Sequence, residues 1–404
     1  MKKQITLILF CFFLLLGSGP TIKAEQALNI NAKEAIAVEY RTGKVLYEKN
    51  SQNKIPIASL TKIMTVYMTL KEIDSGRLKW DDQIKLSKYA KALAKNPDIS
   101  NPPLYKDSYS VRELVDSAMI VSANSSAIAL AEKIAGSEPK FMDMVKEQLK
   151  DWGIKDYQLL NSSGLNNSML NGHIYPGSSH HAENELSARS LAIVARHLIQ
   201  DYPEILSISS QTQLLWGNDV LTNSNHLLPG NNMGRYGVDG LKTGTTAKAG
   251  QTYIGTAVQD NMRVIVVILH ANDAENDNEA RFVEANKLFD YCFQNYKKVT
   301  YGKNKPLPKK LAISNAKQKT VPYVSNTEFS VVQSPSLKSV DYHFKLTEKE
   351  VKAPVKKGEK LGKIIFQDKA DYLDEKPETA IYAAKKVEGL TLWEKFINLF
   401  THQY

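Results

Sequence analysis

Residues 58–70 read ASLTKIMTVYMTL, a short polar start followed by a mostly apolar run that carries one lysine. Ser59 and Lys62 stand three positions apart, so on a helix both side chains face the same side of its first turn. The run predicts a buried helix, and a lysine is rarely buried without a reason. A serine with a lysine amine in reach, at a helix N-terminus where the potential is positive, indicates nucleophilic catalysis.

The Ser-x-x-Lys pattern by itself is weak evidence, because it occurs four times in the chain. The other three pairs lie in polar turn or linker segments: Ser51/Lys54, Ser137/Lys140 and Ser314/Lys317. A serine N-cap with a surface lysine explains those pairs well. It explains Ser59 poorly, because an apolar helix follows that serine directly.

Two further polar motifs follow along the chain. Ser122-Ala123-Asn124 lies in VSANSS, a break between two apolar helical patterns, where local capping is the alternative explanation. Residues 242–245, Lys-Thr-Gly-Thr, lead into predicted strands and offer a cation, a hydroxyl and a bare backbone that a substrate approaches closely. An edge-strand lysine is the alternative there. The order and spacing of the three motifs favour one active site.

Strand patterns at both ends of residues 25–300 indicate the architecture of the larger part of the chain. A hairpin is expected over 35–49 and a second pair of strands over 252–271, with helical patterns between them. The sequence therefore predicts an α+β domain with one antiparallel sheet assembled from both ends. A basic, proline-bearing linker begins at residue 301, and the alternating segments that follow predict a small all-β domain over 301–385.

The first 24 residues have the layout of a secretory signal peptide. Lys2 and Lys3 precede an apolar run over 5–16, and small residues lead to Ala24. The run is too short for a membrane span of about 20 residues, although a retained N-terminal anchor is the alternative. We therefore expect an exported protein.

The last residues, 386–404, predict an amphipathic helix. Seven apolar side chains fall on one half of a helical wheel: Leu390, Leu392, Trp393, Phe396, Ile397, Leu399 and Phe400. A tryptophan and two phenylalanines at a chain end fit attachment to a membrane surface. Packing of this face on the chain's own domain or on a partner is the alternative.

Composition excludes several classes of protein. The chain has 404 residues, of which 43% are hydrophobic and 24% charged, so it is neither disordered nor collagenous. The net charge of +9 falls to +6 without the first 24 residues. Basic residues are not interleaved with aromatic ones, which speaks against nucleic acid. No motif for a metal or a phosphate-bearing cofactor is present, and Cys292 sits in an apolar helical pattern that predicts an inert core position.

The three motifs together resemble those of the low-molecular-mass penicillin-binding proteins. The flanking segments ASLTKIMT, VSANSSAIALAEKIAGSE, NSSGLNN and GVDGLKTGTT resemble the D-alanyl-D-alanine carboxypeptidases of Gram-positive cocci, the DacA type. The resemblance implies a penicillin-binding/β-lactamase-like catalytic domain, with helices flanking the sheet, followed by a small β-sandwich domain. It also implies an enzyme at the outer face of the cytoplasmic membrane that removes the terminal D-alanine from peptidoglycan stem pentapeptides, needs no cofactor and is acylated by β-lactam antibiotics.

The resemblance assigns the catalytic roles to four side chains. Ser59 is expected to be the acylated nucleophile and Lys62 its general base, which requires a pKa depressed by burial and by a cation such as Lys242. Ser122 is expected to relay a proton to the leaving D-alanine. Asn124 is expected to hold both the substrate amide and Lys62.

The resemblance assigns substrate binding to the third motif and to one arginine. Lys242 and Thr243 are expected to receive the terminal carboxylate of the substrate, with help from Arg281. Gly244 completes the motif, and the backbone N–H groups of Ser59 and Thr245 are expected to form the oxyanion hole.

Three other functions are kept as alternatives. A β-lactamase is one, because residues 183–186, Glu-Asn-Glu-Leu, resemble the deacylating glutamate element of class A enzymes. Ser187 stands where those enzymes carry asparagine, and a helix cap by Ser187 explains the segment better. A D,D-endopeptidase or transpeptidase of the same superfamily is the second alternative. A non-catalytic peptidoglycan-binding or sensor protein is the third, and the three intact motifs argue against it.

Overall fold

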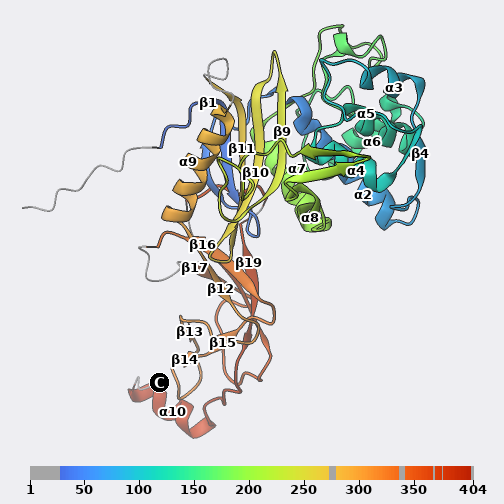
Figure 1. Ribbon diagram of the computed structural model, residues 1–404. Helices are drawn as coiled ribbons and strands as arrows, with labels where there is room; N and C mark the ends of the chain where they lie inside the picture. The colour runs from blue at the N-terminus through green and yellow to red at the C-terminus, as the bar shows by residue number, and fades with distance from the viewer. Residues whose placement is uncertain (1–27, 273–278, 336–341, 367–368, 375, 402–404) are drawn as a thin grey trace, which may run out of the picture. The chain divides into compact units, whose positions relative to one another are not determined.

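The structure is a computed structural model (Figure 1), and it describes residues 28–272, 279–335, 342–366, 369–374 and 376–401. The predicted signal peptide, residues 1–24, lies outside the described residues. Within the described ranges, none of the helices combines the length and the apolar character that crossing a bilayer requires.

A five-stranded antiparallel sheet forms the centre of the larger domain. Its strands lie in the order β2 (Val45–Lys49), β1 (Ala32–Glu39), β11 (Met262–Ala271), β10 (Gly250–Gln259) and β9 (Val238–Thr246). The first hairpin of the chain pairs with a strand more than 200 residues later, and Val38 stands opposite Ile265. The prediction of one antiparallel sheet built from both ends of the domain is confirmed.

Both faces of this sheet are covered by helices, which explains why β11 is apolar from Val264 to Leu269. Side chains alternate between the two faces of a strand. Ile265, Val267 and Leu269 join the core shared with the helical group. Helix α9 (Ala280–Asn295) packs on the same sheet, mostly against β11 and β10. Figure 1 shows α9 on one face and the helical group on the other.

The helical group is formed by the part of the chain between strands β2 and β9. Its helices are α2 (Lys62–Asp74), α3 (Lys88–Ala94), α4 (Val111–Ile120), α5 (Asn124–Ala135), α6 (Glu138–Asp151), α7 (Ala188–Asp201) and α8 (Ile205–Ser209). A capping box opens α4, where the Ser110 side chain accepts from the Glu113 N–H and the Glu113 carboxylate accepts from the Ser110 N–H. Helix α5 is buried along most of its length, so it forms the centre of this group.

Short elements join the helical group to the motifs. The turn η1 (Ala58–Thr61) precedes α2, and strand β9 at the edge of the sheet packs against η1. Three two-stranded pairings complete the described part of the larger domain: β3 (Ile55–Pro56) with β6 (Glu185–Leu186), β4 (Gln83–Lys85) with β5 (Ser108–Ser110), and β7 (Gln213–Trp216) with β8 (Asp219–Thr222).

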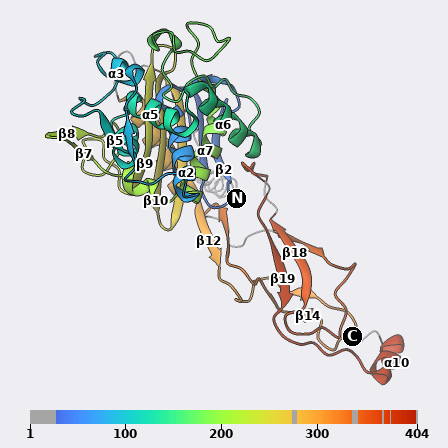
Figure 2. The ribbon, with the colours of Figure 1, turned by 90° about the vertical axis from the view of Figure 1, so that its right-hand side faces the viewer.

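A separate all-β core follows in sequence. Its four-stranded sheet has the order β15 (Tyr323–Val324), β19 (Glu378–Ala383), β18 (Lys360–Phe366) and β17 (Tyr342–Leu346), accompanied by the pairs β12 (Lys297–Tyr301) with β16 (Phe329–Gln333) and β13 (Leu311–Ala312) with β14 (Thr320–Val321). Strands β18 and β19 are seen most clearly in Figure 2. The chain then forms helix α10 (Leu392–Thr401). The predicted small all-β domain and terminal helix are both present.

Candidate active site

The first motif places Ser59 and Lys62 side by side at the start of a buried helix. Ser59 lies in η1, and Lys62 is the first residue of α2, so the two side chains leave the same turn. The Lys62 ammonium nitrogen Nζ is 2.9 Å from Ser59 Oγ. It also donates to Asn124 Oδ1 at 2.8 Å and to the Ser163 carbonyl at 2.7 Å. Lys62 is fully buried, and three oxygen atoms surround its Nζ within hydrogen-bonding distance.

The electrostatic surroundings of Lys62 favour its neutral form. Burial disfavours a charged amine, and the cation of Lys242 repels a second positive charge. Together they hold the pKa of Lys62 well below its ordinary value of 10.5. A lysine amine in this state carries a lone pair that accepts the hydroxyl proton of Ser59 across the observed 2.9 Å. The pair therefore has the chemistry of a nucleophile with its general base.

The second motif lies where α4 ends and α5 begins. Asn124 opens α5 and is buried, with Oδ1 accepting from Lys62 and Nδ2 donating to the Ser100 carbonyl at 2.9 Å. Ser122 has a positive φ of 62° and is 8% exposed. Among the described contacts, no hydrogen bond joins the Ser122 hydroxyl to Ser59 or Lys62. The structure thus brings Asn124 into contact with Lys62 and places Ser122 in the short segment between α4 and α5.

The third motif lies on β9, directly against Ser59. A Cβ atom at Gly244 would stand 3.0 Å from the Ser59 backbone nitrogen and 2.6 Å from Thr252 Oγ1. Real Cβ atoms do not approach so closely, so only glycine lets β9 reach the nucleophile. Lys242 is buried, and its Nζ donates to the Thr243 carbonyl at 2.9 Å. The Thr243 hydroxyl is 2.7 Å from the Ser224 hydroxyl.

Two cations lie beside this end of β9. Burial, with Arg281 nearby, lowers the pKa of Lys242 to about 7. Arg281 belongs to the first turn of α9. It donates to Thr245 Oγ1 and to the Gly244 carbonyl, both at 2.8 Å. Its own pKa is lowered to about 10 by burial. Arg281 therefore braces the strand end and adds positive potential where an anionic substrate group would lie.

Sequence reasoning overlooked the third partner of Lys62, because it is a backbone carbonyl. Ser163 belongs to the loop 161–164, which packs against η1. A Cβ at Gly164 would lie 1.9 Å from the Ala58 carbonyl oxygen, and Gly164 has a φ of +82°. Only glycine fits there. The glycine of NSSGL was the available signal, since a glycine that permits close approach points to a packed backbone.

A buried carboxylate holds this loop in place. Glu138 accepts from the Ser162 N–H at 2.9 Å and from the Ser162 hydroxyl, and the Tyr89 hydroxyl donates to its other oxygen at 3.2 Å. Burial raises the pKa of Glu138. The adjacent Ser162 carbonyl accepts from Thr65 of α2 at 2.7 Å. The loop is therefore fixed to α2 on the side that presents the Ser163 carbonyl to Lys62.

The segment 183–186 braces the site. The Glu183 carboxylate accepts from Asn166 at 3.0 Å and from the Thr246 hydroxyl at 2.7 Å. Asn184 is fully buried and joins the loop at 160–161 to Thr61 of η1. Ser187 caps α7, since its side chain accepts from the Ser190 N–H. Both acceptor oxygens of Glu183 are thus engaged by neighbours.

The remaining candidate residues lie elsewhere. Lys54 forms an ion pair with Asp156 at 3.1 Å, and Lys317 forms one with Glu394 of α10. Cys292 is a buried free thiol of α9 whose pKa is raised by burial. Over the described residues, no group of three or more His, Cys, Asp and Glu side chains is arranged to hold a metal ion.

Comparison with family models assigns both domains. The model described as D-alanyl-D-alanine carboxypeptidase matches residues 21–273. The model described as penicillin-binding protein 5, C-terminal domain, matches residues 295–389. The first match spans more than half of the chain and contains all three motifs.

Individual relatives and solved structures agree with these matches. The D-alanyl-D-alanine carboxypeptidase DacC of Escherichia coli is 30% identical over 90% of this chain and 88% of its own length. The crystal structure of a peptidoglycan synthesis regulatory factor (PBP3) from Streptococcus pneumoniae has a TM-score of 0.78 and 38% identity, covering 89% of this chain and 100% of that one. A penicillin-binding protein of Listeria monocytogenes in its ampicillin-bound form has a TM-score of 0.55 and 29% identity, over 67% of this chain and 100% of that one.

Proposed function

This chain belongs to the D-alanyl-D-alanine carboxypeptidase family, and from that premise we propose that it removes the terminal D-alanine of peptidoglycan stem pentapeptides through an acyl-enzyme on Ser59. The observation that carries the proposal is the fully buried Lys62 amine, 2.9 Å from Ser59 Oγ, with its pKa held low. A permanently charged lysine would have no lone pair with which to take the serine proton.

In the proposed acylation step, Ser59 Oγ attacks the carbonyl carbon of the penultimate D-alanine while Lys62 takes the hydroxyl proton. The C–N bond then breaks, and the departing amine of the terminal D-alanine receives a proton through Ser122. Water hydrolyses the resulting ester in the second step and restores the serine. Asn124 holds Lys62 in reach of Ser59 and offers its side-chain amide to the substrate backbone.

The proposed substrate contacts come from β9. Lys242 and Thr243 receive the terminal carboxylate, and Arg281 adds positive potential behind them. The backbone N–H groups of Ser59 and Thr245 stabilise the oxyanion, and the close approach that Gly244 permits supports this pairing. Loss of one such donor typically costs about 2.7–4 kcal/mol of transition-state stabilisation.

The test is the covalent adduct. Mass spectrometry of the protein after incubation with benzylpenicillin is expected to show one acyl group on Ser59 and none in Ser59→Ala. Ser314→Ala is the matched control, because Ser314 belongs to another Ser-x-x-Lys pair. Its adduct and its D-alanine release should be unchanged. A folded Ser59→Ala protein that is still acylated would contradict the assignment.

The same-superfamily alternatives differ in their products. A carboxypeptidase releases free D-alanine from a pentapeptide, whereas an endopeptidase cleaves cross-links and a transpeptidase joins the acyl group to an amine. A class A β-lactamase needs a glutamate that activates the deacylating water. Glu183 is the candidate for that role, and its engagement by Asn166 and Thr246 supports slow rather than rapid turnover of the penicillin adduct.

We further propose that the protein is exported, with residues 1–24 as its signal peptide, and that residues 386–404 attach it to the outer face of the cytoplasmic membrane. Four large apolar side chains of α10 are exposed by half or more: Leu392, Trp393, Phe396 and Leu399. Exposed apolar area on a terminal amphipathic helix supports burial in a lipid interface. Along the chain, the domain of residues 301–385 then separates the catalytic domain, residues 25–300, from the membrane anchor.

The anchor is tested by deletion. Removal of residues 386–404 is expected to abolish sedimentation with phosphatidylglycerol vesicles while leaving D-alanine release from a soluble pentapeptide unchanged. The double variant Trp393→Ser/Phe396→Ser should also bind these vesicles more weakly. Vesicle binding that survives the deletion would assign the attachment to another surface.

A further inference from the structure

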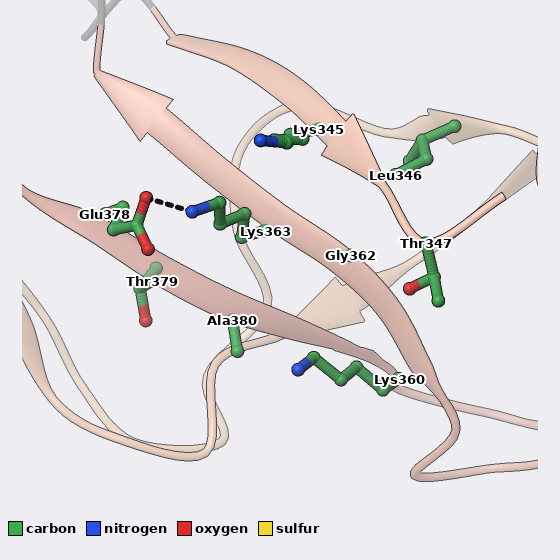
Figure 3. A pocket seen from close by; sticks show the side chains of 9 residues that line it. All are labelled: Lys345, Leu346, Thr347, Lys360, Gly362, Lys363, Glu378, Thr379 and Ala380. Atoms are coloured by element: carbon green, nitrogen blue, oxygen red, sulfur yellow. Dashed lines mark hydrogen bonds and ion pairs between the residues drawn. The ribbon is translucent and has the colours of Figure 1, made fainter. Parts of the chain in front are cut away.

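The outer face of the sheet formed by β15, β19, β18 and β17 is hollowed into a groove of about 460 Å³. Three lysines line it, Lys345 from β17 and Lys360 and Lys363 from β18, as Figure 3 shows. Ala380 of β19 stands opposite Lys363 and leaves room beside these long side chains. Gly362 lets β18 and β17 approach closely, since a Cβ there would lie 2.4 Å from the Lys345 carbonyl oxygen. None of these residues belongs to the active site.

The arrangement of charges in this groove is unfavourable for the sheet itself. Lys345 stands directly opposite Lys363 on the neighbouring strand, and like charges in that position repel each other. Glu378 of β19 pairs with Lys363. In the described part of the chain, Lys345 and Lys360 have no acidic partner. Both are exposed, so their ammonium groups remain available to an anion from solution.

The domain that contains the groove also carries an excess of positive charge. Residues 301–385 contain 17 lysines and no arginine against ten acidic residues, an excess of seven positive charges. Residues 25–300 contain 30 basic and 31 acidic residues. The positive charge of the chain is therefore concentrated in the β domain, and the groove lies within it. Such a field attracts polyanions.

We propose that this groove binds a linear anionic polymer whose repeating unit is a polyol phosphate. A lysine ammonium binds phosphate as a compact point charge, and it does not require the paired acceptor oxygens that the planar fork of an arginine matches. The basic side chains that line the groove are all lysines. Among the described residues that line it, no aromatic side chain is present to stack on a base, so a nucleic acid is disfavoured.

The shape of the site favours a chain over a lipid surface. The lysines line a hollow, whereas a flat bilayer contacts side chains that protrude. An extended polymer of small units can lie in the groove between Lys345 and Lys360, over the small side chain of Ala380. Binding releases counterions from a linear polyanion, so we expect it to weaken steeply as salt is added.

The test compares two triple variants of the full-length protein. K345Q/K360Q/K363Q removes the groove lysines, and K303Q/K305Q/K310Q removes three exposed lysines elsewhere in the same domain. Binding to fluorescent poly(glycerol phosphate) is measured by anisotropy at several salt concentrations. The groove variant is expected to lose affinity about tenfold or more, because the positive charge of the groove is removed, and the control about twofold or less.

Three outcomes would overturn the proposal. Equal losses in both variants would mean that the polymer responds to net charge alone. Loss of phosphatidylglycerol vesicle binding in the groove variant, with polymer binding intact, would assign the groove to lipid. If the unaltered protein does not bind the polymer, the proposal that the groove is a polymer-binding site is wrong. Penicillin acylation of Ser59 and the thermal unfolding midpoint, measured on every variant, show that the fold and the active site are intact.

Discussion

Lysines of two kinds occupy the two domains of this protein. Lys62 and Lys242 are buried in the catalytic domain, whereas Lys345 and Lys360 line an open groove in the β domain. Burial removes hydration from an amine and favours its neutral form, so a buried lysine can accept a proton. An exposed ammonium stays hydrated and acts as a counterion. The same side chain thus supplies a base in one domain and positive charge in the other.

The largest expected effect comes from Lys62→Arg. A guanidinium remains charged at every accessible pH, so it cannot take the Ser59 proton. We expect kcat/KM for D-alanine release to fall by about 10²–10⁴-fold, the usual contribution of general-base catalysis. Lys62→Met should lose as much without adding a bulky cation to the core. Lys345→Arg is the control and should change neither activity nor acylation. An active Lys62→Arg enzyme would contradict the assignment of Lys62 as the general base.

Lys242→Gln is expected to have the next largest effect, and it changes the pH profile. Lys62 works in its deprotonated form, and the nearby Lys242 cation lowers its pKa. Removing that cation raises the pKa of Lys62, so the acidic limb of kcat/KM moves to higher pH. The lost contact with the substrate carboxylate should also reduce kcat/KM about 10–100-fold, as expected for a charged hydrogen bond.

The control for that profile is Lys248→Gln, which removes an exposed lysine from the turn after β9. Its acidic limb should coincide with that of the unaltered enzyme. An acidic limb that stays in place in Lys242→Gln would show that burial alone sets the pKa of Lys62.

A smaller effect is expected from Asn124→Ala. It removes one of the three acceptors that surround the Lys62 amine. We expect the acylation rate with benzylpenicillin to fall about tenfold, from the loss of one buried hydrogen bond. Asn101→Ala is the matched control, because Asn101 accepts from the Ser125 N–H at the start of α5 without touching Lys62. Equal losses in the two variants would mean that helix stability, and not contact with Lys62, matters.

The smallest effect is expected from K345Q/K360Q/K363Q on catalysis. D-alanine release from a soluble pentapeptide should stay within about twofold of the unaltered enzyme, because these lysines belong to the β domain and exposed charges are screened by salt. A large loss would show that the groove lysines support the active site, and the contrast between buried and exposed lysines would need revision.

The nucleophile pair could be identified from the sequence because its geometry is local. Ser59 and Lys62 lie one helical turn apart, so their spacing alone brings the side chains together. The Ser110 cap of α4 and the Ser187 cap of α7 were predictable for the same reason. The apolar pattern of residues 263–271 likewise predicted the strand that is observed there as β11.

Other parts of the site depend on contacts between distant segments. Ser163 contacts Lys62 across 101 positions through a backbone carbonyl, an atom that every residue carries and no motif reveals. The engagement of Glu183 by Thr246 also joins segments 63 positions apart. The β-domain groove depends on strand register, since only the pairing of β17 with β18 sets Lys345 opposite Lys363.

The sequence by itself therefore determined the kind of chemistry: the serine, the lysines, the helices and strands that carry them, and the family resemblance. Only the tertiary structure decided how those groups behave. It buried Lys62 beside Lys242, closed the loop of Gly164 over Ala58, and left the lysines of β17 and β18 open to solvent. The physical reason is that residue identity and short spacing are local properties, whereas burial, and with it the pKa and the charge of an amine, depends on what the rest of the chain packs around it.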